Sequence, residues 1–172
     1  MTLDARLQRF DRTRQHLMAE MAALDAARLQ ATPIPGKWSI LQIVEHLVVA
    51  ERAVFLGLPD PSRLVAGTRG LGHHLRYALV MSVLRLGVPV RVPSPAMSPR
   101  GGRELGDLVR MWDENQQWLR TVAAGLGSAV ERAAVLAHPI AGPLTVGQGV
   151  RMGQVHVDGH IRQIRQRQRL LA

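Results

Sequence analysis

The sequence predicts an all-α fold built from four long helices. Apolar residues recur at steps of three and four positions in four separate segments, which is typical of amphipathic helices. Proline and glycine concentrate between these segments and mark the connections. A chain of 172 residues suits one domain, which can bury about 70% of its unfolded surface. We therefore expect a single domain over residues 1–172.

The first helix is expected from Leu3 to Leu29. It ends before Pro33 and Pro35, because proline cannot continue a helix. Its inward face carries apolar residues at helical spacing: Leu3, Leu7, Phe10, Leu17, Met21, Leu24 and Ala27.

The second helix is expected to begin after Ser39, a good N-cap residue, and to run to about Leu56. The residue before the cap, Trp38, is interpreted as a core anchor. His46 lies in the middle of this helix, at a position that the apolar stripe carries towards the core. The stripe consists of Ile40, Ile43, Val44, Leu47, Ala50 and Val54.

An extra short helix is expected from Leu75 to Leu86, followed by a long connection over residues 88–102 that leads to the third long helix. The short helix is apolar nearly all round, so its surface must be covered. A cap over the bundle is the favoured interpretation. The alternatives are a homodimer surface and an interfacial membrane helix.

The third long helix is expected from Glu104 to Ala124, with Gly125 and Gly127 ending it. Its packing residues are Leu105, Leu108, Trp112, Trp118, Leu119 and Val122. Its polar residues are expected to point mostly outward: Asp113, Glu114, Gln116 and Gln117.

The fourth helix is expected to begin after Thr145 as its N-cap. Four glycines interrupt it, and each costs up to ~1 kcal/mol relative to alanine in a helix interior. Gly149 and Gly153 share a face with two histidines, and we expect them to admit a neighbouring helix rather than a substrate. The apolar stripe consists of Val146, Val150, Val157, Ile161 and Ile164.

Those two histidines, His156 and His160, are four positions apart and therefore project from one face of the helix. This is metal-ligand spacing, although core neighbours share it. Together with His46 they would place three imidazoles in an apolar bundle. Burial without a partner costs about 1–3 kcal/mol for each polar group. A shared divalent ion removes that cost. The chain has no cysteine, so the ligands must be nitrogen or oxygen atoms.

Four stretches of the chain resemble the DinB-like superfamily, which includes the YfiT-type metal-dependent enzymes. Residues 37–51 look like its second helix, residues 92–95 like its proline-containing connection, and residues 138–145 like its closing loop. The run His156, His160, Gln163 is similar to its last helix. The resemblance implies a four-helix bundle with a divalent metal ion held by His46, His156 and His160. Some members use low-molecular-weight thiols such as mycothiol or bacillithiol for transfer or isomerisation, and others are described as hydrolases.

Three protein ligands would leave one coordination position for water or substrate, as in catalytic zinc sites. Zinc and nickel are the expected ions, and iron and manganese also accept imidazoles. The carboxylates beside the ligands, Glu45 and Asp158, are expected to face solvent. The sequence leaves open whether three further histidines contribute to the site: His73, His74 and His138.

The leading interpretation is therefore a metal-dependent transferase or hydrolase that uses a low-molecular-weight thiol. The second is a non-catalytic metal- or ligand-binding bundle, and the third is a basic module that binds nucleic acid. The net charge of +9 comes almost wholly from arginine. Only the tail clusters these arginines, and we interpret it as a solvated helix end: Arg162, Arg165, Arg167 and Arg169.

The charge favours a small anionic substrate, because basic surfaces attract anions. We expect no nucleic-acid partner and no membrane partner. The charged N-terminal segment does not resemble a signal peptide, so a cytoplasmic location is expected.

Overall fold

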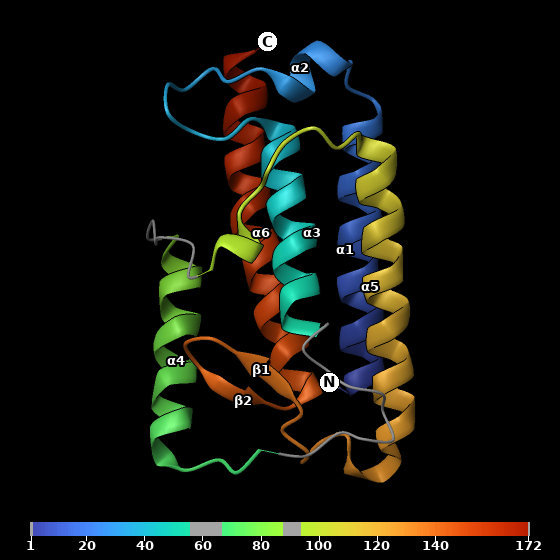
Figure 1. Cartoon of the computed structure of the whole chain (residues 1–172), viewed down its shortest axis with the longest axis vertical. Coiled ribbons are helices and arrows are strands. Elements are labelled where there is room, and N and C mark those ends of the chain that lie inside the picture. The colour runs from blue at the N-terminus through green and yellow to red at the C-terminus, as the bar shows by residue number, and fades with distance from the viewer. Residues whose placement is uncertain (1, 56–66, 88–93, 172) are drawn as a thin grey trace.

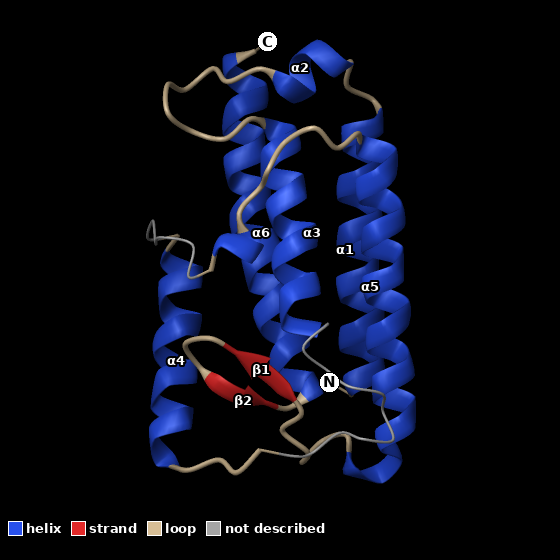
Figure 2. Ribbon diagram, viewed as in Figure 1, coloured by secondary structure: helices blue, strands red, loops and turns tan. Residues whose placement is uncertain are grey.

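The computed structural model describes residues 2–55, 67–87 and 94–171. Four long helices form its body: α1 (Leu3–Ala22), α3 (Ile40–Phe55), α5 (Leu105–Leu126) and α6 (Val146–Leu170). They run side by side along the long axis of the molecule, and α4 (Leu71–Leu86) lies at its edge (Figure 1). The predicted all-α fold is confirmed, and a small two-stranded sheet is the only strand structure among the described residues (Figure 2).

The first expected helix is broken into two. α1 ends at Ala22, and a separate short helix, α2, runs from Ala26 to Gln30. The break has a local cause: the side chain of Asp25 accepts a hydrogen bond from the backbone N–H of Arg28 at 2.8 Å and begins a new helix. The expectation of one helix to Leu29 is therefore wrong, because an N-cap residue outweighs the continuing apolar spacing.

The start of α3 agrees with the sequence. The Ser39 hydroxyl accepts from the N–H of Gln42 at 3.1 Å, and the Gln42 side chain accepts from the N–H of Ser39 at 2.9 Å. This reciprocal pair satisfies two backbone donors at the end of the helix. Leu56, its expected last residue, lies outside the described part of the chain.

α5 begins after Glu104, passes through Gly125 and ends at Leu126, where Gly127 follows as the C-cap with a φ of +48°. One side chain expected to point outward does not: Gln116 is only 4% exposed. It lies in the interface with α3, where it donates a hydrogen bond to Glu51 at 2.6 Å. The neighbouring Glu114 is exposed, as expected.

A hairpin that the sequence did not predict precedes α6. Strand β1 (Leu136–His138) pairs with β2 (Gly142–Leu144) in antiparallel register. Its turn needs a glycine, because Gly142 has a φ of +76°. The hairpin then leads directly into Thr145, which caps α6 with Gln148.

Two glycines of α6 admit close neighbours: at Gly153 the neighbour is a helix, as expected, but at Gly149 it is a strand of the hairpin and not a helix. A Cβ at Gly149 would lie 2.2 Å from the side chain of Leu136, and a Cβ at Gly153 would lie 3.1 Å from the ring of Phe10. Gly149 therefore admits the hairpin, and Gly153 admits α1. In both cases packing partners, and not open space, occupy the positions where side chains would stand.

The core fills the space between the four long helices. Its largest fully buried side chains are Trp112, Phe10, Leu17, Met21, Ile40, Ile43, Leu47, Leu108, Leu119, Leu136, Leu144 and Ile164. Burial of one such aliphatic or aromatic side chain contributes about 1.5–3 kcal/mol, so this core holds the bundle together without disulfides.

α4 packs against α6 and β2 through one face, which includes the buried Met81. Its opposite face leaves large side chains exposed, among them Leu71 and Leu86, each at 78%. The helix is thus a cap on one side of the bundle, and a homodimer through its outer face stays a prediction. No helix in the described part of the chain combines the length and apolarity needed to cross a bilayer.

Candidate metal centre

The structure brings together the three histidines that the sequence singled out. His46 projects from α3, and His156 and His160 project from α6 one turn apart. α3 and α6 pack against each other (Figure 1). Their three histidines therefore meet, with the ligand atoms all within 4.8 Å of one another. His46 is buried and the other two are half-buried.

The Nε2 atoms converge. His156 Nε2 lies 3.2 Å from His46 Nε2 and 3.1 Å from His160 Nε2. Two imidazole nitrogens bound to a tetrahedral zinc ion at 2.0–2.1 Å would be separated by about 3.4 Å. The observed distances are close to that value. The ring planes also meet at steep angles of 69° to 83°, as rings arranged around one point do.

Two of the rings are oriented by partners on their other nitrogen. His46 Nδ1 donates a hydrogen bond to the carbonyl oxygen of Met97 at 2.6 Å. His160 Nδ1 donates to the side-chain oxygen of Gln163 at 3.2 Å. Such outer partners set the tautomer of metal-ligating histidines and orient the ring. Both neutral imidazoles therefore present an Nε2 lone pair to the centre.

Too few hydrogen-bond donors are available for the Nε2 lone pairs of the three histidines. His156 Nε2 lies between two acceptors, and in its neutral form it can carry at most one proton. At least one buried acceptor is left without a full hydrogen bond, which is costly in a low-dielectric interior. A cation bound by all three nitrogens satisfies every one of them, so the residues present fit a divalent metal ion.

The electrostatics favour neutral ligands. Burial lowers the pKa of His46, although its bond to Met97 opposes the shift. Burial and the neighbouring imidazoles hold the pKa of His156 well below its usual range. Burial, followed by the charge of His46, lowers the pKa of His160 to about 4. A metal needs unprotonated nitrogen, and all three groups are unprotonated at neutral pH.

Trp38 closes one side of the centre. Its ring centroid lies 4.9 Å from that of His46. The residue is half-buried and packs against the hydrophobic core, as expected, and it also forms a wall of the site. Its carbonyl oxygen accepts a hydrogen bond from Arg167 at 2.9 Å, and the same guanidinium donates to the carbonyl of Gln163.

The expectation that the arginine tail is solvated is therefore wrong for Arg167, which is only 5% exposed. Its bonds join the segment before α3 to the end of α6, beside two of the proposed ligands. The other three arginines of the tail are exposed, as expected.

The expectation that Glu45 faces solvent is also wrong, since this residue is 2% exposed. Its carboxylate accepts hydrogen bonds from the backbone N–H groups of Arg100 and Gly101 at 3.1 and 2.9 Å and forms an ion pair with Arg103. Glu45 thus fastens the connection that carries Met97. The second carboxylate, Asp158, is half-buried and accepts a hydrogen bond from Gln154.

The other histidines hold local structure. His138 Nδ1 accepts hydrogen bonds from the N–H groups of Ile140 and Ala141, within the hairpin turn. His73 Nδ1 accepts from the N–H of Gly70 at the start of α4. The metal-ligand cluster found among the described residues contains neither of these nor His74, and it contains no carboxylate.

The sequence found the three imidazoles but missed Met97 as a partner of His46. A backbone carbonyl has no side-chain signature, so residue types alone could not reveal it. The one available signal was the Ser94–Pro95 pair, which begins the short helix η2 (Pro95–Met97) beside α3.

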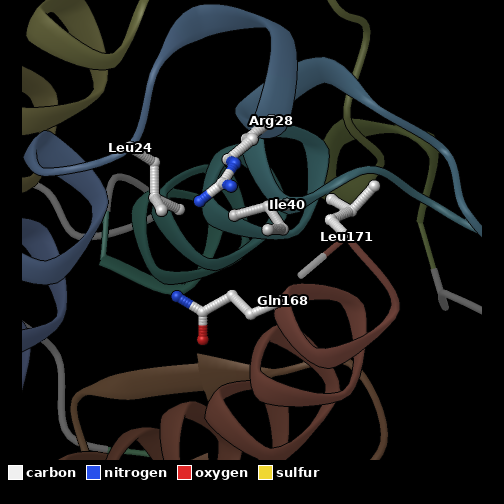
Figure 3. Close-up of a pocket in the computed structure, with 5 residues that line it drawn as sticks. All are labelled: Leu24, Arg28, Ile40, Gln168 and Leu171. Carbon is white, nitrogen blue, oxygen red and sulfur yellow. The ribbon is translucent and has the colours of Figure 1, made fainter.

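A crevice of about 30 Å³ lies at the end of the bundle between α2, α3 and α6 (Figure 3). A cavity this small holds one or two water molecules and no substrate. It is lined by Leu24, Arg28, Ile40, Gln168 and Leu171.

Comparison with protein families finds a match to the DinB superfamily over residues 9–164. The matched span contains all three clustered histidines together with Gln163. No curated protein matches the chain. No solved structure matches it either.

Proposed function

The chain belongs to the DinB superfamily, and we propose that it is a metal-dependent enzyme, a transferase or a hydrolase, with its ion held by His46, His156 and His160. One observation carries the proposal: three Nε2 atoms from two helices converge while outer partners orient two of the rings. A histidine cluster that served packing alone would not need its lone pairs directed at one point.

Three nitrogen ligands suit a catalytic site better than a structural one, because structural zinc sites usually have four protein ligands. No carboxylate or fourth histidine belongs to the cluster among the described residues. A bound ion would supply Lewis acidity and lower the pKa of a water or thiol bound to it. Zinc and nickel fit the nitrogen donors best.

The residues around the centre have separable tasks in this proposal. Met97 and Gln163 keep the donor nitrogens aimed inward. Trp38 shields one side of His46 from water. Glu45 holds the connection in place, and through it the carbonyl of Met97.

We also propose a low-molecular-weight thiol as the co-substrate. The chain has no thiol of its own. Sulfur is a good ligand for an open position on zinc, and a thiolate is a strong nucleophile. A hydrolase that activates water would need no such thiol, so the two reactions are distinguishable.

A non-catalytic metal-binding protein is the second candidate. It is favoured by the burial of His46, which is 6% exposed, and by the lining of the crevice at the end of the bundle, which includes none of the three clustered histidines. Access of a substrate to the ion is the property that separates the two candidates.

Cobalt substitution tests this access. Cobalt in a site with an open position gives a visible spectrum that changes when a thiol binds. We expect millimolar mycothiol, bacillithiol or a simple thiol analogue to change the spectrum of the cobalt protein. An unchanged spectrum, together with a fourth protein ligand on the ion, would instead identify a structural metal site.

A further inference from the structure

A second cavity lies on the outer side of α3, and the metal centre does not account for it. It is open to solvent and has a volume of about 410 Å³ between α3, α5 and the connection that contains η2. This volume falls within the range of small-molecule sites. We call it the arginine cavity, and it is lined by Val49, Arg52, Ala53, Ala96, Ser98, Arg100, Arg103 and Met111.

Three guanidinium groups from two segments border the arginine cavity. Arg52 comes from α3, and Arg100 and Arg103 come from the connection. Arg52 pairs with Glu114 at 3.2 Å, and Arg103 pairs with Glu45. Each of these pairs engages one terminal nitrogen of an arginine that carries five N–H donors, so donors are left for a ligand.

Arg100 differs from the other two. Its backbone N–H is bonded to Glu45, but among the described residues no ion pair involves its side chain. The cavity therefore has three cations and two neighbouring carboxylates, both already paired. An anion would meet a net positive charge there.

The remaining walls are apolar or small. Val49 and Ala53 form the α3 side, Ala96 lies on η2, and Met111 contributes a flexible side chain from α5. A site with an apolar wall and a few charged donors recognises a ligand that has both an apolar part and an anionic group. Inorganic anions alone would leave the apolar wall in water.

The rim of the cavity is fixed before any ligand binds. Glu45 holds the backbone of Arg100 and Gly101, and His46 holds the carbonyl of Met97, whose neighbours Ala96 and Ser98 line the cavity. Glu45 and His46, two consecutive residues of α3, therefore anchor the connection before and after Ser98. Preorganisation of this kind lowers the entropy cost of binding.

From these observations we propose that the arginine cavity binds a small organic anion, a carboxylate or a phosphate monoester with an apolar body. Arg100 and Arg52 contact the anionic group, and Val49, Ala53 and Met111 contact the apolar part. This binding is separate from the metal centre, because Met97 lies between the cavity and His46. It does not depend on the identity or the presence of the ion.

Titration calorimetry on the full-length protein tests the proposal with three probes: phenyl phosphate, phenylacetate and the uncharged benzyl alcohol. Both anions are expected to bind, and the alcohol is expected not to bind. The tighter of the two anions identifies the preferred anionic group. Absence of heat from both anions at about 10 mM, a concentration that detects millimolar affinity, overturns the proposal.

Variants locate the site. Arg100→Gln and Arg52→Gln should each weaken anion binding roughly tenfold, because each removes a charge-assisted hydrogen bond. Arg110→Gln is the matched control: it removes the same charge from α5, but Arg110 is exposed, pairs with Asp107 and does not line the cavity. Its affinity should stay within about twofold of the wild type. Equal losses in all three variants would indicate non-specific attraction and contradict the assignment.

His160→Ala separates the cavity from the metal centre. This variant lacks a proposed metal ligand but keeps every residue of the arginine cavity, so it should bind both anions as the wild type does. Loss of anion binding in His160→Ala, with retention in Arg100→Gln, would place the anion on the metal and overturn the proposal. Circular dichroism of every variant checks that it is folded.

Discussion

α3 carries polar groups that face the protein interior on two sides, the buried His46 and the half-buried Glu51, and the two faces differ in how these groups are satisfied. On one face His46 meets His156 and His160, and acceptors outnumber donors. On the other face the carboxylate of Glu51 accepts hydrogen bonds from the buried Trp112 at 2.8 Å and Gln116 at 2.6 Å.

The Glu51 face is complete within the protein. Asn115 beside it donates to the carbonyl of Val48, and the buried Arg14 pairs with Asp11 and Asp113. The histidine face lacks a positive charge that would complete it. Buried polar groups in native proteins are satisfied, so the incomplete face is the one that indicates a ligand. Satisfaction of the polar groups, and not their burial alone, separates a structural network from a binding site.

Replacement of the acceptor on the complete face has the largest expected effect on stability. Glu51→Leu leaves the Trp112 and Gln116 donors buried without partners, at about 1–3 kcal/mol for each group. We expect the free energy of unfolding to fall by about 2–4 kcal/mol in chemical denaturation. Glu114→Leu, at an exposed site in α5, is the control and should change stability by less than about 1 kcal/mol. A Glu51→Leu protein as stable as the wild type would contradict the structural role of this face.

The pH dependence of stability distinguishes the faces by sign. Burial raises the pKa of Glu51 to about 7, so its contribution to stability is full below pH 4.5 and is lost as the pH rises through 7. The pKa of His160 is lowered to about 4, so in metal-free protein its contribution is present above pH 6.5 and is lost as the pH falls towards 4.

The wild type should therefore lose on the order of 2 kcal/mol of stability between pH 4.5 and pH 8, and Glu51→Gln should not show this loss. Unfolding midpoints at a series of pH values, in chelator, measure it. The slope should change in Glu51→Gln and stay unchanged in Glu114→Gln. Identical pH profiles for wild type and Glu51→Gln would show that this carboxyl titrates normally.

The outer partner of His160 should affect the metal and leave the fold intact. Gln163→Leu removes the acceptor that orients His160 and should weaken metal affinity at least about tenfold. Competition with a chromogenic chelator measures the affinity. Gln166→Leu, on an exposed position of the same helix, is the control. Equal affinities for the two variants would remove Gln163 from the site.

The smallest expected effect on stability comes from a change in the histidine cluster of metal-free protein. In metal-free protein, His156→Leu removes the imidazole that lies between two acceptors, and the free energy of unfolding should change by less than about 1 kcal/mol or rise. With metal present the wild type should gain stability by mass action and the variant should not. A large destabilisation of the metal-free variant would instead mark this face as a structural network like that of Glu51.

The long helices were predictable because each has a sustained apolar period, and the starts of α3 and α6 were predictable from their capping residues Ser39 and Thr145. The hairpin was not, because strands of three residues are too short to show a period. The break at Asp25 was missed because the apolar spacing continued through it. An aspartate followed by a helical turn was the available signal.

The shared face of His156 and His160 was predictable from their spacing, because residues four apart on a helix project to the same side. Their meeting with His46 was expected from its place on the inward stripe and from the resemblance to the DinB-like superfamily. The burial of Glu45 was not predictable from the sequence. Its position next to His46 correctly excluded it from the ligand face, but the connection covers a second face of α3 and buries it. Such covering by irregular segments leaves little trace in the sequence.

Metal content tests the central claim most directly. Protein purified without an affinity tag and supplied with zinc or nickel should contain about one ion per chain by elemental analysis. His156→Ala should contain almost none. His16→Ala, which removes a histidine 75% exposed on α1, should match the wild type. Full occupancy in His156→Ala, or a wild type that retains no ion, would contradict the account.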